Sequence, residues 1–88
     1  MDKCWKLYIL RCGDGSLYTG ITVDVQARLE MHRSGKGAKY TRGRGPLELV
    51  YEVECGSHSD ALKREYAMKQ LPHGEKLKLI DAYKTAAG

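Results

Sequence analysis

The chain has 88 residues and a mass of 9.9 kDa, which is the size of one domain and leaves no room for a second. Its composition, 42% apolar and 30% charged, is typical of a folded globular domain and argues against disorder. No apolar run approaches the ~20 residues that span a membrane. Three cysteines without a Cys-x-x-Cys pair argue against a disulfide scaffold, and the first residues contain no long apolar stretch, so we expect no secretory leader. We therefore expect a single cytoplasmic domain covering residues 1–88.

The positive charge gathers in one segment. The net charge of the chain is +4, and residues 31–46 contain five cations and no acidic residue. These cations are Arg33, Lys36, Lys39, Arg42 and Arg44. Four glycines in the same segment would let the backbone approach a ligand closely. The segment is either a phosphate-binding surface for nucleic acid or a solvated basic loop, and composition alone favours the second.

The first two predicted elements form a β-hairpin. Residues 5–12 are apolar and aromatic and end at a Gly-Asp-Gly turn, after which residues 17–21 form the partner strand. A three-residue loop, with its last glycine in the left-handed region, would pair Tyr8 with Gly20. This register places Tyr8 and Tyr18 on one face of the sheet, whereas a loop of two or four residues would place them on opposite faces.

A helix follows the hairpin. Thr22 or Asp24 can cap its first turn, and it runs to about residue 34 and ends at Gly35. Arg28 and His32 are four residues apart, so they share one face of this helix. The positions predicted to face the core are Val25, Leu29 and, as a further candidate, Met31.

One strand and two helices complete the predicted fold. Residues 47–55 alternate between apolar and acidic side chains, with Val50 as the exception, which is typical of an edge strand or a strand buried on one side. Residues 57–70 and 75–85 form the last two helices. The residues predicted to separate them are Pro72 and Gly74. The order β-β-α-β-α-α predicts an α+β fold, in which a small three-stranded antiparallel sheet is flanked by helices.

Five residues on these elements carry chemistry that could act together. Tyr8 and Tyr18 lie on the hairpin, Arg28 and His32 on the first helix, and Glu65 on a later helix among several cations. Each of them alone has an ordinary explanation: a core tyrosine, a solvated helix face, or an ion pair with a lysine four residues on. Only the combination points to a reactive site.

The combination resembles the GIY-YIG nuclease family, in its small stand-alone bacterial branch. The two tyrosine motifs correspond to KLYIL at residues 6–10 and YTG at residues 18–20. The Arg-x-x-x-His element is RLEMH at residues 28–32, and ALKREYAMK at residues 61–69 contains the glutamate that the family uses for metal binding. The branch also carries the stretch GKGAKYTR, which stands here at residues 35–42.

The resemblance implies a GIY-YIG-like domain that hydrolyses phosphodiester bonds in DNA, as an endonuclease of DNA repair or processing. Glu65 would hold one Mg²⁺ or Mn²⁺ ion, and Arg28 would bind the scissile phosphate through a bidentate pair of hydrogen bonds. Tyr18 is the favoured group to position or deprotonate the attacking water, with Tyr8 hydrogen-bonded in the same site. His32 would shuttle a proton or contact phosphate. The residues that would hold the DNA backbone are Arg33, Lys36, Lys39, Arg42 and Arg44.

Targeting would come from the basic segment, from a homodimer or from a protein partner, and no membrane is involved. Two other functions fit the sequence. The first is a nucleic-acid-binding module with a weak or vestigial catalytic site, which would be indifferent to Glu65→Gln. The second is a zinc-stabilised or interaction protein that uses Cys12, Cys55 and His58, although their spacing matches no usual zinc pattern. We expect the cysteines to be buried, because cysteine behaves as a small apolar residue.

Overall fold

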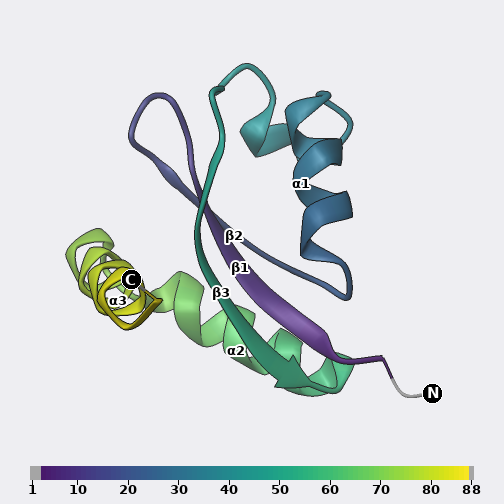
Figure 1. Ribbon diagram of the computed structural model, residues 1–88, viewed down its shortest axis with the longest axis vertical. Coiled ribbons are helices and arrows are strands. Elements are labelled where there is room, and N and C mark those ends of the chain that lie inside the picture. Colours follow the sequence, from purple (N-terminus) through teal and green to yellow (C-terminus); the bar gives the residue numbers. More distant parts are fainter. Residues whose placement is uncertain (1–2, 88) are drawn as a thin grey trace.

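The computed structural model describes residues 3–87 and confirms the predicted order of strands and helices. A single turn of 3₁₀ helix, η1, is added in the glycine-rich segment. Figure 1 shows the elements along the chain. Their bounds are β1 (Trp5–Arg11), β2 (Leu17–Thr22), α1 (Val25–Arg33), η1 (Lys39–Thr41), β3 (Glu48–Gly56), α2 (His58–Gln70) and α3 (His73–Ala87).

The hairpin of β1 and β2 has the predicted three-residue loop. Tyr8 pairs with Gly20 and Leu10 pairs with Tyr18 across the antiparallel ladder. Gly15 has φ +86°, a conformation that residues with a side chain rarely adopt, so it turns the chain at the end of the loop. The side chain of Asp14 accepts hydrogen bonds from the backbone and the hydroxyl of Ser16 and fixes this turn. The two tyrosines therefore lie on the same face of the sheet.

All three strands are antiparallel, in the order β2-β1-β3, so β1 is central and β3 is an edge strand as predicted. Val50, the exception in the alternating pattern, lies at a β-bulge. Ile9 pairs with Tyr51 but Leu10 pairs with Leu49, which leaves Val50 as the extra residue on β3. The bulge turns Val50 onto one face of the sheet while Leu49 packs on the other.

Helices cover both faces of the sheet and make three layers (Figure 1). On one face, Val25 and Leu29 of α1 pack against Tyr8 and Leu10 of β1. On the other face the core is formed by Leu7, Ile9, Val50, Met68 and Ile80, from β1, β3, α2 and α3. The central strand is buried on both sides, which is why residues 7–10 form a continuous apolar run.

The helix ends follow local capping chemistry. Asp24 caps α1 by accepting a hydrogen bond from the backbone N–H of Ala27, and Gly35, with φ +81°, follows its last turn. Ser57 caps α2 through the N–H of Asp60. None of the helices among residues 3–87 has the length and apolar stretch needed to cross a bilayer.

Three details of the sequence prediction were wrong. Met31 is exposed, because it lies on the side of α1 that faces away from Val25 and Leu29. Gly74 does not separate the helices: α2 ends at Gln70 with Leu71 as its C-cap, just before Pro72, and α3 already begins at His73. Cys12 is buried, but Cys4 is exposed near the start of β1.

Candidate functional site

The two tyrosines of the hairpin face each other but differ in their surroundings. Their ring centroids are 6.3 Å apart. Tyr8 lies on the central strand beneath α1 and is 1% exposed, whereas Tyr18 on the edge strand is only partly buried. The parity of the hairpin thus creates a pair of phenols in which one is enclosed and the other is open.

His32 of α1 is the nearest polar partner of Tyr8. It is 2% exposed, and its Nε2 lies 2.8 Å from the Tyr8 hydroxyl. Its other ring nitrogen, Nδ1, lies 2.9 Å from Oγ1 of Thr41 and 3.3 Å from the backbone nitrogen of Ala38. Both ring nitrogens are therefore used inside the protein, which makes His32 a fixed group in the core.

The backbone of Ala38 decides which nitrogen of His32 carries the proton. Its N–H has a fixed direction and donates to Nδ1, so Nδ1 is the acceptor and the proton of the neutral ring is on Nε2. With Nδ1 as an acceptor, the hydrogen bond between Thr41 and His32 requires the Thr41 hydroxyl to donate to Nδ1, 2.9 Å away, rather than to the carbonyl of Ala38 at the same distance. Nε2–H then donates to the Tyr8 oxygen, and the Tyr8 O–H remains available to donate to another group.

Two glycines make room for this arrangement. A Cβ on Gly37 would lie 2.3 Å from Nδ1 of His32, and a Cβ on Gly20 would lie 2.5 Å from the Tyr8 oxygen. Both distances are far below van der Waals contact. The pairing of Tyr8 with Gly20 therefore depends on the missing side chain at residue 20, and the close approach of Gly37 to His32 explains one of the glycines in the basic segment.

Arg28 of α1 lies beside the two phenols, and part of its guanidinium has no hydrogen-bond partner among the described residues. Its Nε is buried and has no hydrogen-bond partner among the described residues. The guanidinium makes a weak contact with the sulfur of Met31, 3.9 Å from NH1, and interacts with the Tyr8 hydroxyl. A buried N–H of a permanent cation without a partner is costly, so this position favours an anionic ligand such as a phosphate.

Glu65 approaches the phenols from α2, the helix on the opposite face of the sheet. Its side chain is 22% exposed and forms an ion pair of 3.6 Å with Lys69, one helical turn on. The Glu65 carboxylate also raises the pKa of both Tyr8 and Tyr18, which places it within electrostatic reach of the two rings. The edge position of β2 allows groups from both faces of the sheet to meet there.

The surroundings shift three pKa values in this cluster. Burial raises the pKa of Tyr8 to about 12, and the adjacent Arg28 guanidinium opposes part of that rise. Burial also raises the pKa of Tyr18, while Arg28 lowers it and Glu65 raises it. Burial and the charge of Arg28 lower the pKa of His32. At neutral pH both phenols are protonated and His32 is neutral.

The chemistry of the cluster fits a hard divalent cation held by one carboxylate. Among residues 3–87 no group of three or more His, Cys, Asp or Glu side chains could hold a metal ion. Mg²⁺ can bind at a site with a single carboxylate, because it keeps several water ligands and is often bound by one or two carboxylates together with substrate phosphate. Glu65 is partly exposed and could take that role on release from Lys69.

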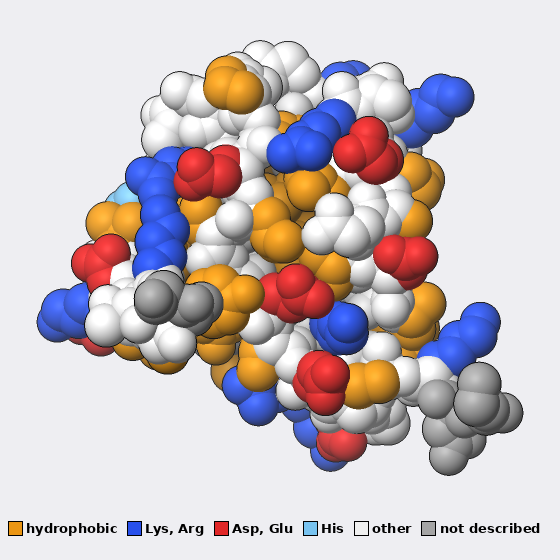
Figure 2. Space-filling view, viewed as in Figure 1, with side chains coloured by type: hydrophobic (Ala, Val, Ile, Leu, Met, Phe, Trp, Pro, Cys, Tyr) orange, Lys and Arg blue, Asp and Glu red, His pale blue; other side chains and the backbone are white. Residues whose placement is uncertain are grey.

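The five predicted DNA-binding cations do not behave alike. Arg33 is 3.5 Å from Glu30 and donates to the carbonyl of Leu47. Arg44 pairs with Asp14 of the hairpin loop and lies 4.4 Å above the Tyr40 ring. The exposed cations without a carboxylate in salt-bridge distance among the described residues are Lys36, Lys39 and Arg42. In Figure 2, cations and acids are interspersed over the face in view and form no single basic patch.

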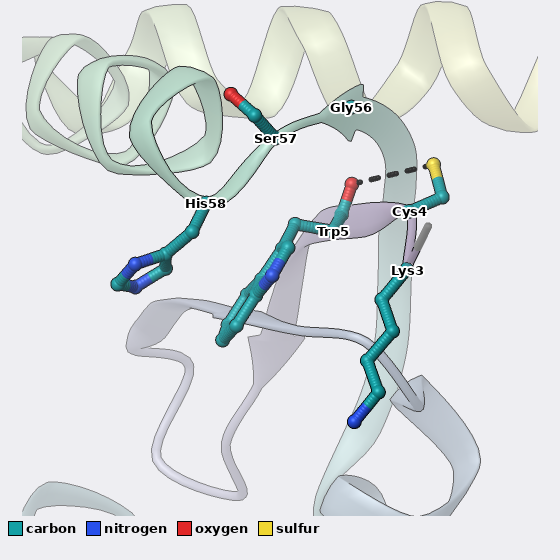
Figure 3. A pocket seen from close by; sticks show the side chains of 6 residues that line it. All are labelled: Lys3, Cys4, Trp5, Gly56, Ser57 and His58. Carbon is teal, nitrogen blue, oxygen red and sulfur yellow. Dashed lines mark hydrogen bonds between the residues drawn. The ribbon is translucent and has the colours of Figure 1, made fainter. Parts of the chain in front are cut away.

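A large cavity lies away from these residues. It has a volume of about 560 Å³ and is lined by Lys3, Cys4, Trp5, Gly56, Ser57 and His58. Figure 3 shows the rings of Trp5 and His58 in this cavity, and their centroids are 4.3 Å apart. It contains none of the five catalytic candidates, so volume alone does not locate the candidate site.

Sequence reasoning missed the residues that hold His32. Gly37, Ala38 and Thr41 stand in a segment that the sequence marks only as basic and glycine-rich. Their roles depend on the fold of η1 back over α1, since two of the three act through backbone groups or the lack of a side chain. The only available signal was the resemblance of residues 35–42 to one branch of a family.

Comparison with protein families gives an independent match over most of the chain. Residues 4–78 match the model of the GIY-YIG catalytic domain. This range contains all five catalytic candidates and the whole basic segment. Nucleases with this domain generally use a divalent metal.

Individual relatives are similar along nearly their whole length. The UPF0213 protein OB0043 of Oceanobacillus iheyensis is 57% identical over 81 residues, which cover 92% of this chain and 94% of the relative. A UPF0213 protein of Yersinia pestis is 54% identical over 79 residues, covering 90% and 83%.

Two solved structures share the fold. The solution NMR structure of the UPF0213 protein BH0048 from Bacillus halodurans has 48% identity and a TM-score of 0.58, covering 90% of this chain and 84% of that one. The solution NMR structure of EF2693 from E. faecalis has 35% identity and a TM-score of 0.64, covering 97% and 93%.

Proposed function

Because this chain belongs to the GIY-YIG family, we propose that it is a divalent-metal-dependent endonuclease that hydrolyses phosphodiester bonds in DNA. The observation that carries the proposal is the buried Nε of Arg28, which has no hydrogen-bond partner within residues 3–87 and lies next to two phenols. A phosphate diester supplies the negative charge and the acceptor oxygens that this group lacks. Glu65 completes the site from the opposite helix.

The groups of the chain divide the reaction between them. Arg28 binds the scissile phosphate and stabilises the charge that develops on it. Tyr8, whose oxygen accepts from His32, donates its own proton to a phosphate oxygen and keeps it, because its pKa is about 12. Tyr18, which is open to the substrate side, first gives its own proton to solvent, and the charge of Arg28 favours this loss. The phenolate then accepts the proton of the attacking water as the water oxygen bonds to phosphorus, and the ester bond breaks as its leaving oxygen takes a proton from solvent.

A divalent cation on Glu65 would neutralise the carboxylate that raises the pKa of Tyr18 and would add positive charge beside the phosphate. The chain's own contribution is to place a half-buried carboxylate within electrostatic reach of both phenols. His32 acts by orientation: as a neutral, buried ring bonded at both nitrogens, it holds Tyr8 in place.

Contacts to the DNA backbone come from the exposed cations Lys36, Lys39 and Arg42, which have no carboxylate partner among the described residues. Such contacts fix a strand without reading its sequence. The single domain of residues 1–88 would act in the cytoplasm in DNA repair or processing, with Mg²⁺ or Mn²⁺ as its ion. Targeting by a homodimer or a protein partner belongs to the same proposal.

The test is a cleavage assay with labelled single-stranded, duplex and branched DNA in Mg²⁺ or Mn²⁺. We expect cleavage by the full chain that disappears with EDTA and with Glu65→Gln. Glu54→Gln is the matched control, because Glu54 is exposed on β3 and has no ion pair among the described residues. Binding without cleavage on every substrate would instead indicate the nucleic-acid-binding module with a vestigial site.

A further inference from the structure

A groove of about 230 Å³ runs beside the edge strand β2, next to the candidate catalytic site. It is lined by Leu17, Tyr18, Thr19, Tyr40, Lys69 and Lys76. Tyr18 belongs to both the groove and the catalytic cluster, so a strand bound at Arg28 can continue into the groove. We propose that this groove binds one unpaired nucleotide of the DNA strand next to the scissile phosphate. The inference rests on the proposed function, since it assumes a DNA substrate at Arg28.

Tyr40 supplies an aromatic wall that is held in place before any ligand arrives. The ring is 43% exposed, and its centroid lies 5.9 Å from that of Tyr18. Arg44 lies 4.4 Å above the ring and is itself paired with Asp14 of the hairpin loop. An exposed aromatic ring with fixed orientation is the feature on which proteins stack unpaired bases.

The opposite wall carries positive charge. Lys69 of α2 and Lys76 of α3 line the groove from the other face of the sheet. Lys69 pairs with Glu65, but Lys76 has no carboxylate in salt-bridge distance among residues 3–87. A ring on one side and a free ammonium group on the other match the base and the phosphate of one nucleotide.

Thr19 gives a second, independent indication of a ligand. The residue is 3% exposed and lines the groove, yet its Oγ1 has no hydrogen-bond partner among the described residues. Buried hydroxyl groups nearly always have a partner, and a missing one marks a place where a ligand or water is expected. A sugar or phosphate oxygen in the groove would supply it.

The ligand must be unpaired. A base in a continuous duplex is stacked between its neighbours and cannot offer its face to Tyr40. The groove therefore favours cleavage beside an unpaired nucleotide over cleavage within an uninterrupted duplex.

Binding in EDTA tests the inference without any catalysis. Fluorescence anisotropy of the full chain is measured with a labelled single-stranded DNA and with a strand of equal length built from abasic sites. We expect Tyr40→Leu to weaken binding of the normal strand five- to tenfold, the low end of base–aromatic stacking, and to leave the abasic strand unchanged. Lys76→Gln should weaken both strands and reduce the salt slope by about 0.7.

Lys84→Gln is the matched control, since Lys84 is an exposed lysine near the end of the same helix and outside the groove. Equal loss for both strands in Tyr40→Leu, or equal effects of Lys76→Gln and Lys84→Gln, would overturn the inference. Duplex bound as tightly as single strand would do the same, and so would an RNA strand bound more tightly with the same dependence on Tyr40. Failure of cleavage in Mg²⁺ would contradict the proposed function alone.

Discussion

The candidate site has two halves, each with a tyrosine of the same hairpin. In the enclosed half, Tyr8 is hydrogen-bonded to His32. His32 is in turn hydrogen-bonded to Ala38 and Thr41 of the segment around η1. In the open half, Tyr18 lies beside Arg28 and within reach of Glu65, and the Nε of Arg28 lacks a partner among residues 3–87.

The difference shows how two identical side chains acquire different roles. Burial and internal hydrogen bonds make Tyr8 a fixed donor that keeps its proton. Exposure to the substrate side and charged neighbours make Tyr18 the group whose proton can respond to a ligand. We therefore expect changes in the enclosed half to reduce stability and changes in the open half to reduce cleavage alone.

Arg28→Ala should have the largest effect on activity. Loss of the phosphate ligand removes a preorganised donor for the developing charge, and we expect cleavage to fall by about 10²–10³ with the melting temperature nearly unchanged. Arg28→Lys should recover only part of the rate, because an ammonium group lacks the planar fork. Arg64→Ala, an exposed arginine of α2, is the control; single-turnover cleavage at the wild-type rate in Arg28→Ala would remove Arg28 from the site.

Gly37→Ala and Gly20→Ala should have the largest effect on stability. Each Cβ would displace a group of the enclosed half, His32 or the Tyr8 hydroxyl. Forcing extra volume into a packed core costs roughly 1–3 kcal/mol, and each kcal/mol lowers the melting temperature by about 4–8 °C in a domain of this size. Urea unfolding measures the loss. Gly74→Ala is the control because a Cβ there meets nothing within 4 Å, and equal stability of all three variants would contradict the packing of the enclosed half.

Acidification should act on the enclosed half through His32. Its pKa is lowered by burial and by Arg28, so the unfolded chain binds a proton at His32 more readily than the folded chain does. As the pH falls below about 6.5, the free energy of unfolding must fall, until the folded His32 is also protonated. Melting temperatures from pH 8 to pH 5 measure this, and His32→Gln should show a shallower fall. An identical pH dependence in the variant would show that His32 is not held neutral.

The smallest effects should come from the basic segment. Lys36→Gln should weaken DNA binding severalfold and reduce the salt slope by about 1, because it removes one phosphate contact. For Lys36, Lys39 and Arg42 the loss of DNA affinity should appear without a change in the free energy of unfolding. Arg44→Gln should instead lower stability slightly, since its partners Asp14 and Tyr40 are on the surface and solvent screens the ion pair. DNA-affinity titrations at several salt concentrations distinguish Lys36→Gln from Arg44→Gln. Equal salt slopes for the two variants would contradict the different roles of Lys36 and Arg44.

Local rules predicted the elements and the face shared by the tyrosines. The Gly-Asp-Gly loop determines the hairpin register, and the register determines the side of the sheet on which Tyr8 and Tyr18 lie. Capping by Asp24 and Ser57 likewise follows from short-range hydrogen bonds. Such features need only neighbours in the chain, so the sequence pattern contains them.

Features that depend on contacts between distant parts of the chain could not be predicted from the sequence pattern. The sequence does not show that Gly37 meets His32, or that Arg44 is used by Asp14 of the hairpin loop. The groove beside β2 needs residues from β2, η1, α2 and α3 at once. Even the irregular position of Val50 became interpretable only when the pairing with β1 revealed the bulge.

The division into two halves is tested most directly by removing each phenol hydroxyl in turn. Tyr8→Phe and Tyr18→Phe are compared in single-turnover DNA cleavage and in urea unfolding. We expect Tyr18→Phe to lose about 10²-fold or more in cleavage with unchanged stability. Tyr8→Phe should also lose about 1–3 kcal/mol of stability, because Nε2 of His32 is left buried without its partner. Cleavage at the wild-type rate by Tyr18→Phe, or equal stability of the two variants, would contradict the division of the site into an enclosed and an open half.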